Sequence, residues 1–281
     1  MLRLTGYGLR LASQLPVPGA VADDGDVLPD VTIALESSRP TGAAPIYDRI
    51  RDGLNFVCPG VASYRIAPDM IAVAPDPAAA PGMVSGMLVA TALPALLWLR
   101  GRFVLHAGAA RLPGGVALAI AGESGRGKST ILAQLVESGA ALIGDDTIAF
   151  DMSADQPASG LSGGWFAAAE AGSDRCFVAA APAKSLAAAP IAAILVLEER
   201  GGEEGDIARL DPVVAVVSLL ANRHRPRIPA LLGRTAETLR DATLLAGAIP
   251  LYSWRRRAGV EALTPTEWTV LKRLGTGREI E

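Results

Sequence analysis

Short apolar segments separated by glycine, proline and polar residues characterise residues 1 to about 85. Segments of this length, bounded by turn-forming residues, are typical of β-strands. Asp69 lies between the last two segments, and aspartate favours turns, so we expect a turn there. The predicted strands are Leu2–Leu4, Gly8–Ala12, Val31–Leu35, Leu54–Val57, Ala62–Ile66 and Met70–Val73. We therefore expect a β-rich N-terminal region over residues 1–85.

A proline-rich stretch over residues 75–81 marks the end of this region, and the spacing of apolar residues changes beyond it. The longest apolar run, Met87–Leu99, contains Pro94 and ends at Arg100. The run is shorter than the ~20 apolar residues that a bilayer-spanning helix needs. We therefore expect a buried helix over Met83–Leu99 and no contact with a membrane.

Beyond residue 100 the pattern alternates between strand-like and helix-like segments. The predicted strands are Arg102–Ala107, Val116–Ile120, a strand from Ala140 into Asp145, Ile191–Leu197 and Ile249–Trp254. The predicted helices are one after Lys128 that Gly139 caps, Pro212–Ala221, Leu231–Ala246, and Pro265–Arg273 with Thr264 as its N-cap. Residues 152–176, rich in Ala, Gly and Ser, are expected to form either an active-site loop or an irregular segment. The alternation predicts an α/β domain over residues 86–281.

A glycine-rich segment between the second of these strands and the first helix has the pattern G-x-x-x-x-G-K-S, typical of phosphate-binding loops. It comprises Gly122, Glu123, Ser124, Gly125, Arg126, Gly127, Lys128 and Ser129, and Thr130 follows it. Glycines allow positive φ and close approach of a phosphate, and successive N–H groups form an anion nest at the helix N-terminus. Lys128 would contact the β- and γ-phosphates, and the Ser129 hydroxyl would bind Mg²⁺. Strand, loop and helix follow in the required order, which predicts nucleotide binding by residues 122–130; the alternative is a glycine turn that binds nothing.

Two adjacent carboxylates, Asp145 and Asp146, follow the strand that begins at Ala140. The chain from Lys128 to Asp145 is long enough for one helix, a glycine turn and one strand, and we expect this strand to lie beside the loop strand. Both carboxylates would then lie near the γ-phosphate, where phosphoryl transfer needs a Mg²⁺ ligand and a base for the nucleophile. Asp145 and Asp146 can divide these two roles, the Mg²⁺ ligand and the base, between them. The alternative is that one of them caps a turn.

Three segments together resemble the catalytic core of the HPr kinase/phosphorylase family. They are Phe103–His106, Gly122–Ser129 and Leu142–Asp146. The match is closest to the smaller HPr-kinase-like proteins encoded beside lasso peptides, to which Leu9–Pro18 is also similar. This resemblance implies a kinase core with a P-loop and a mixed sheet, preceded here by the smaller β-rich region.

The resemblance also implies roles for individual residues. Asp146 would be the general base that takes the proton of a serine hydroxyl, Lys128 a γ-phosphate contact and Ser129 a Mg²⁺ ligand. His106 would be an active-site residue near the transferred phosphate. On the residues alone, His106 would more often be a buried histidine bonded to a backbone carbonyl.

Several candidate residues remain open. The Glu-Ile-Arg-Gly-Leu-Gly run of the family, with its Mg²⁺-binding glutamate, is absent, and Glu170 lies at about its distance but among alanines. Glu198 follows a predicted strand, like the acidic residue that ends a strand in ordinary P-loop ATPases. The alternative is that it belongs to a turn. Two basic clusters, residues 223–227 and 255–257, are either solvated surface or contacts for ATP phosphates or an acidic peptide.

Net charge, cysteine content and the N-terminal segment limit the possible functions and location of the protein. The formal net charge of −3 gives no bulk attraction to nucleic acid. Two cysteines, Cys58 and Cys176, form neither a disulfide framework nor a metal cluster. The N-terminus has no secretory pattern, so we expect a cytoplasmic protein.

We therefore expect an ATP- and Mg²⁺-dependent kinase that phosphorylates a serine of a small protein or peptide, such as a lasso precursor. A small-molecule kinase on the same core and a nucleotide-switched regulatory module without transfer activity are the alternatives. The sequence leaves open ATP versus GTP and whether the chain forms a homo-oligomer.

Overall fold

The protein has a mixed α/β architecture with mixed sheets. The computed structural model describes residues 1–43, 45–113, 115–152, 158–161, 163–166, 176–179, 188–201, 206–257 and 262–276. Within these ranges the strands form sheets of eight, six, four and two strands. The expectation of an α/β fold is therefore confirmed at this level.

The N-terminal region forms the eight-stranded sheet, in the order β3-β1-β2-β4-β8-β7-β6-β5. Its strands are β1 (Leu2–Gly6), β2 (Leu9–Ser13), β3 (Val21–Ala22), β4 (Val31–Leu35), β5 (Ile46–Ile50), β6 (Gly53–Cys58), β7 (Ala62–Ala67) and β8 (Met70–Pro75). All six predicted strands are present, most of them longer by one or two residues. The sequence analysis missed β3, which is very short, and β5, which has Asp48 and Arg49 among its apolar residues.

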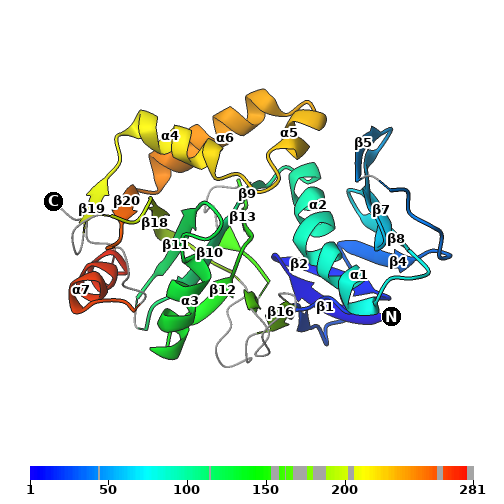
Figure 1. Cartoon of the computed structure of the whole chain (residues 1–281), viewed down its shortest axis with the longest axis horizontal. Helices are drawn as coiled ribbons and strands as arrows, with labels where there is room; N and C mark the ends of the chain where they lie inside the picture. The colour runs from blue at the N-terminus through cyan, green and yellow to red at the C-terminus, as the bar shows by residue number, and fades with distance from the viewer. Residues whose placement is uncertain are drawn as a thin grey trace.

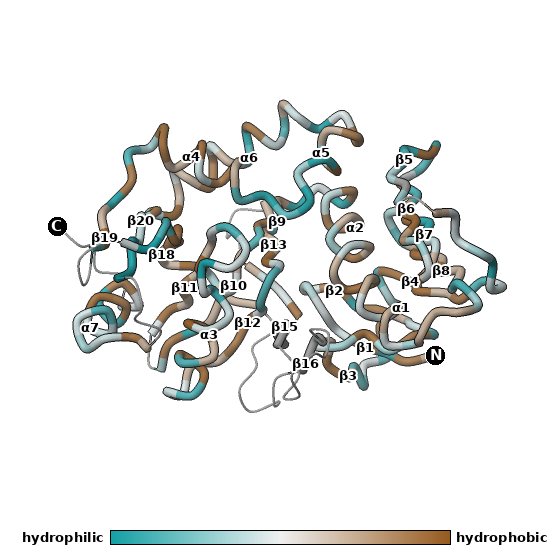
Figure 2. Tube along the Cα trace, in the orientation of Figure 1, coloured by the Kyte–Doolittle hydropathy of each residue, from teal (hydrophilic) through white to brown (hydrophobic). Residues whose placement is uncertain are grey.

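A continuous apolar helix follows, from α1 (Pro81–Met87) through a π-helical turn, η1 (Leu88–Ala92), to α2 (Leu93–Leu99). It begins earlier than expected, and its 19 residues are long and apolar enough to cross a membrane, contrary to the length argument from the sequence. In its most apolar window 67% of the helix is nevertheless buried inside the protein, so the prediction of a buried helix is confirmed. Figures 1 and 2 show this apolar helix between the N-terminal sheet and the central sheet.

The six-stranded central sheet has the order β12-β10-β11-β18-β20-β19. Its strands are β10 (Ala107–Arg111), β11 (Ala117–Gly122), β12 (Ala141–Gly144), β18 (Ile191–Leu197), β19 (Asp206–Arg209) and β20 (Leu251–Arg255). Strand β18 runs parallel to both β11 and β20, whereas β10 is antiparallel to β11 and β12. The expectation that the strand from Ala140 lies beside the loop strand is therefore wrong, because β10 lies between β12 and β11. Since β12 and β11 still point the same way, their carboxyl ends share one edge of the sheet.

The predicted strand Arg102–Ala107 is also wrong as a single element. Its residues divide between β9 (Phe103–Leu105), in the four-stranded sheet, and β10 in the central sheet. His106 lies at the crossing between the two sheets, where its N–H donates to the Asn222 carbonyl at 2.8 Å. The other strands of the four-stranded sheet are β13 (Ile148–Phe150), β14 (Ala158–Ser159) and β17 (Ala188–Ala189), and β15 (Gly163–Phe166) pairs with β16 (Cys176–Ala179).

The remaining helices are α3 (Lys128–Glu137), α4 (Pro212–Ala221), α5 (Arg227–Leu231), α6 (Thr235–Ala248) and α7 (Pro265–Leu274). Helix α3 packs on the central sheet at β10, β11 and β12, α4 packs against α6, and α5 packs against α2 and α6. The predicted helix Leu231–Ala246 starts too early, because Gly233 takes a positive φ of 72° between α5 and α6. The predicted Thr264 cap is present, as a capping box with Glu267.

The buried core links the two predicted regions. One cluster of buried apolar residues includes Tyr64 of the N-terminal sheet, Trp98 of α2 and Ile194 of the central sheet. A second cluster lies beneath α3 and α7, with Leu132 and Leu271 among its members. The domain boundary near residue 85 therefore stays a prediction, since side chains from both sides of it share one core.

Candidate functional site

The glycine loop, Gly122–Ser129, joins the end of β11 to α3 as predicted. Gly122, Gly125 and Gly127 take φ values of 140°, 85° and 101°, a region that side-chain-bearing residues rarely adopt. A Cβ on Gly122 would come within 2.9 Å of the Leu197 carbonyl oxygen, whereas one on Gly125 would meet nothing within 4 Å. The loop therefore needs glycine for close packing on β18 at its start and leaves open space at its middle.

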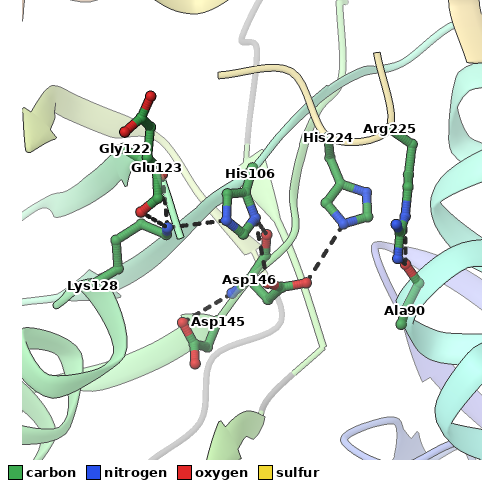
Figure 3. Close-up of polar contacts among 9 residues, drawn as sticks. All are labelled: Ala90, His106, Gly122, Glu123, Lys128, Asp145, Asp146, His224 and Arg225. Atoms are coloured by element: carbon green, nitrogen blue, oxygen red, sulfur yellow. Dashed lines mark hydrogen bonds and ion pairs between the residues drawn. The ribbon is translucent and has the colours of Figure 1, made fainter. Parts of the chain in front are cut away.

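Lys128 is buried at the first position of α3. Its Nζ donates to the carbonyls of Gly122 (2.7 Å) and Glu123 (3.0 Å) and lies 3.0 Å from Nε2 of His106, as Figure 3 shows. Burial lowers the pKa of the ammonium, and the charges of Asp146 and Asp145 oppose that shift. Lys128 thus joins the glycine loop to the histidine at the sheet crossing.

The two predicted carboxylates follow β12 and point in different directions. Asp145 is buried, and its Oδ1 accepts the N–H of Asp146 at 2.9 Å. A Cβ on Gly108 of β10 would lie 2.0 Å from Cδ1 of Leu132 and 3.2 Å from this oxygen, so the glycine chiefly leaves room for Leu132 of α3 and also lies close to the carboxylate. Asp146 has a φ of 69°, and this left-handed conformation turns its side chain toward the histidines.

His106 lies between Lys128 and Asp146. Its Nδ1 is 3.0 Å from the backbone carbonyl of Asp146 and 3.3 Å from Oδ1 of the same residue. Because the ammonium of Lys128 donates to Nε2, we assign the ring proton to Nδ1, which donates to Asp146. Burial lowers the pKa of His106, with Lys128 and His224 adding to the effect and Asp146 opposing it. His106 therefore combines both expectations from the sequence: it is bonded to a backbone carbonyl, and it lies among the candidate site residues.

His224 is a site residue that the sequence analysis missed. Its Nε2 lies 3.5 Å from Oδ2 of Asp146, and the side chain is almost fully buried. Sequence analysis placed it in the basic cluster of residues 223–227, for which a solvated surface was one of the expected alternatives. The chain contains two histidines in all. Their rarity was the sequence signal that could have suggested a common site.

The segment Asn222–Arg225, here called the strap, brings His224 to Asp146. The N–H of His224 donates to the Val104 carbonyl (2.9 Å), and Nε1 of Trp98 donates to the carbonyl of His224 (2.9 Å). Arg225 has a φ of 53°, and its Nη2 donates to the Ala90 carbonyl at 3.1 Å. In an α-helix that oxygen would accept the N–H of residue 94, which is proline and has none. The irregular turn in the apolar helix thus provides an anchor for the strap.

A cleft of about 390 Å³ opens above these groups. The glycine loop contributes one wall, through Gly122 to Ser124, and residues 221–226 contribute the other. His106, Asp146 and His224 also line it. A ligand in the cleft would therefore contact the loop, the carboxylate and both imidazoles.

The Asp146 carboxylate is held in its ionised form. Burial alone would raise its pKa, but the hydrogen bond from His224 and the charges of His224, His106 and Lys128 together lower it. Burial lowers the pKa of His224 as well, against the opposing effect of Asp146. The two imidazoles carry those charges only at low pH, where Asp146 titrates; at neutral pH an ionised carboxylate lies between two neutral imidazoles, and Lys128 lies between His106 and the glycine loop.

The other predicted residues lie at or near the loop. Ser129 is half-buried in the first turn of α3, Thr130 is exposed, and Arg126 pairs with Glu123 at 2.8 Å. Glu198 follows Leu197, which is in register with Gly122, and its carboxylate bonds Arg255 at 2.7 Å. Glu170 lies outside the described residues.

The two basic clusters have different roles in the fold. Arg256 is buried and bonds Glu267, so in this structure it makes a core ion pair and does not face a phosphate site.

Arg200 was not singled out in the sequence, but its Nη2 would be 3.2 Å from a Cβ on Gly127. This guanidinium thus lies against the loop and is a further candidate for a phosphate contact.

The N-terminal region also reaches the site. The Tyr7 hydroxyl is buried and hydrogen-bonds Thr147, the residue after Asp146. Burial, with the charge of Asp146 adding to it, raises the pKa of Tyr7, which keeps the hydroxyl neutral at physiological pH. The β-rich region therefore packs directly behind the carboxylate pair.

In comparisons with known proteins, no family model matches the chain, and no curated protein sequence matches it. The function must therefore be inferred from the geometry of the glycine loop, the carboxylate pair and the two histidines.

Proposed function

We propose that the chain is an ATP- and Mg²⁺-dependent kinase of the HPr kinase/phosphorylase kind, which phosphorylates a serine of a small protein or peptide in the cytoplasm. One observation carries the proposal: Asp146 is joined to the glycine-loop Lys128 through a single side chain, His106. A base this close to the loop lysine suits phosphoryl transfer from a loop-bound nucleotide, because the acceptor hydroxyl must meet both the base and the γ-phosphate.

Each residue has a defined role in this reaction. Asp146 accepts the proton of the serine hydroxyl as the serine oxygen bonds to the γ-phosphorus. The bond from that phosphorus to the β,γ-bridging oxygen breaks, and ADP leaves with the electron pair. Lys128 turns from the carbonyls of Gly122 and Glu123 to the phosphate oxygens, whose charge it neutralises. His106 donates to Asp146 and holds the base in place.

The residues fit the nucleotide and its metal. The positive φ of Gly122, Gly125 and Gly127, and the open space above Gly125, suit a backbone cradle for phosphate. Mg²⁺ prefers oxygen ligands, which the Ser129 hydroxyl and the Asp145 carboxylate would supply. When bound, the metal would neutralise part of the charge on the phosphate oxygens.

The test is transfer of label from γ-³²P-ATP. The purified chain is incubated with a library of serine-containing peptides that includes lasso-precursor sequences. We expect a phosphoserine product, lost in Asp146→Asn and Lys128→Ala and kept in Asp69→Asn, which alters an exposed aspartate of a turn. Full transfer by Asp146→Asn would remove the assignment of the base.

The same experiment separates the alternatives. A small-molecule kinase would label a metabolite from a cell extract but none of the peptides. A nucleotide-switched module would bind ATP and label nothing. Binding of ATP by Asp146→Asn, measured by calorimetry, shows whether a loss of transfer reflects chemistry or loss of the nucleotide site.

A further inference from the structure

Both histidines of the chain meet at one carboxylate, although they come from distant segments: the crossing between β9 and β10, and the strap after α4. We propose that His106, Asp146 and His224 form a binding site for Zn²⁺. This site is distinct from the Mg²⁺ ligands of the proposed kinase and uses a different class of donor atoms. Its occupation would suppress phosphoryl transfer, and only this consequence rests on the proposed function.

The distances suit a tetrahedral ion. Zn²⁺ bonds of about 2.0–2.1 Å place neighbouring ligand atoms roughly 3.3–3.4 Å apart in a tetrahedral site. Nδ1 of His106 lies 3.3 Å from Oδ1 of Asp146, and Nε2 of His224 lies 3.5 Å from Oδ2, so each nitrogen is near this separation from one of the two carboxylate oxygens. One ligand atom from each of the three residues lies within 4.8 Å of the others. Small side-chain rotations would therefore bring all three atoms to bonding distance of one ion.

The donor atoms favour zinc over magnesium. Imidazole nitrogen suits Zn²⁺, whereas Mg²⁺ demands oxygen ligands in octahedral geometry. The three residues also line the open cleft, so solvent reaches the fourth coordination position. Three protein ligands and one open position are typical of zinc sites that bind water or a ligand, rather than of closed structural sites.

Each imidazole can present a nitrogen lone pair to Zn²⁺ if its ring proton moves to the other nitrogen, and this shift leaves the net charge unchanged. Among the described residues Nδ1 of His224 has no hydrogen-bond partner, so its proton can move there from Nε2. For His106 the proton must move from Nδ1 to Nε2, where Lys128 now donates. Lys128 must therefore release this nitrogen, while it keeps its bonds to the carbonyls of Gly122 and Glu123. Lys128 and Zn²⁺ thus compete for His106.

Zinc would act on transfer through Asp146. Zn²⁺ bound to the carboxylate withdraws electron density from both oxygens and occupies the space beside them, so Asp146 becomes a poorer acceptor for the serine proton. Chelation of the ion would restore the base. Because the two imidazoles supply most of the affinity, the effect should depend on His224 as well as on the base itself.

Direct binding tests the site without any need for activity. Calorimetry with ZnSO₄ and no nucleotide is run on a Cys58→Ser/Cys176→Ser background, which removes both thiols and leaves two imidazoles in the chain. We expect one ion per chain, at least tenfold weaker binding in His106→Ala and in His224→Phe, and tighter binding in Lys128→Met. Unchanged affinity in both histidine variants would overturn the site.

A second measurement covers the case in which a histidine variant does not fold. In the same background, nitrogen-15 NMR of the two imidazoles is followed as one equivalent of Zn²⁺ is added. Shifts of both rings support the site, and a spectrum in which either ring is unaffected overturns it. If zinc binds but the chain transfers no phosphate, the proposed function fails and the site stands. If the chain transfers phosphate and neither ring responds, the site fails and the function stands.

Discussion

The rings of His106 and His224 lie on either side of the Asp146 carboxylate, with centroids 5.9 Å apart. Each ring faces a different carboxylate oxygen, His106 facing Oδ1 and His224 facing Oδ2. The histidine on the side of the glycine loop also contacts Lys128, whereas the other is held by the strap. Asp146 is therefore oriented from two directions, one linked to the nucleotide site and one to the apolar helix.

The first prediction concerns His224 as a positioning residue. Replacing it with alanine removes a 3.5 Å contact between an imidazole nitrogen and a charged oxygen, which is long for a hydrogen bond and therefore worth about 1 kcal/mol. If that energy orients the base, kcat of phosphoryl transfer should fall by roughly 5- to 10-fold, with little change in KM for ATP. Initial rates over a range of ATP concentrations measure both constants.

His224→Gln is the matched variant, because its amide can place a donor near the position of Nε2. We expect it to recover part of the rate that His224→Ala loses. A rise in KM with unchanged kcat would instead assign His224 to nucleotide binding. Equal rates in the wild type and both variants would remove the positioning role.

The second prediction compares two glycines of the loop. In Gly122→Ala a side chain with φ near 140° adds strain of roughly 1–3 kcal/mol, together with a clash at 2.9 Å against the Leu197 carbonyl. Gly125→Ala adds strain of only about 1–2 kcal/mol, because its Cβ meets nothing within 4 Å. Urea unfolding should therefore show a larger loss of stability for Gly122→Ala. A larger loss for Gly125→Ala would contradict the packing of the loop on β18.

Local pattern was sufficient for elements that have clear boundary residues on both sides of an apolar run. Val31–Leu35, Ile191–Leu197 and Pro212–Ala221 have the predicted bounds, because turn residues, a charged pair or a capped proline flank each apolar run. The Thr264 cap was predictable for the same reason. Arg102–Ala107 was not, since an unbroken apolar run does not reveal that the chain changes sheets at His106.

The site was predictable only where its chemistry lies in one segment. The glycine loop is contiguous, and Asp146 follows it at the distance of one helix and one strand, so both could be proposed. His224 reaches Asp146 through backbone bonds of the strap to Val104 and a side-chain bond from Trp98. Such contacts depend on the packed fold, and a basic cluster in the sequence does not reveal them.

The third prediction contrasts adjacent arginines. Nε and Nη2 of Arg256 bond the Glu267 carboxylate at 2.7 and 3.1 Å, and both side chains are buried. Arg256→Ala leaves a buried carboxylate without this partner, a change that typically destabilises by about 3–5 kcal/mol. Arg255→Ala removes a half-exposed pair with Glu198, typically worth about 0–1 kcal/mol.

Chemical denaturation of the two variants measures both values. We expect the midpoint of Arg256→Ala to fall well below that of Arg255→Ala, although the residues are neighbours in the sequence. Equal midpoints would mean that the buried pair contributes no more than the exposed one.

The fourth prediction follows from the pKa of Glu267. Burial alone would raise this pKa, but the hydrogen bonds from Arg256 and from the backbone of Thr264 together lower it below its ordinary value of 4.5. A carboxyl whose pKa is lower in the folded state stabilises the fold fully above the unfolded value, and that contribution is lost as pH falls through the folded value. The free energy of unfolding should therefore decline below about pH 4.5, partly through Glu267.

The comparison with Glu267→Gln isolates this contribution. The difference in unfolding free energy between wild type and variant should be largest near neutral pH and should shrink as the carboxyl is protonated in the wild type. Glu137→Gln, which alters an exposed residue of α3, should differ from the wild type by less than about 0.5 kcal/mol at every pH. Because the buried arginine keeps its charge throughout, protonation of Glu267 leaves that charge unpaired, as the amide of the variant does at every pH. A difference that stays constant from pH 7 to pH 3 would show that the ionised state of Glu267 contributes nothing to stability.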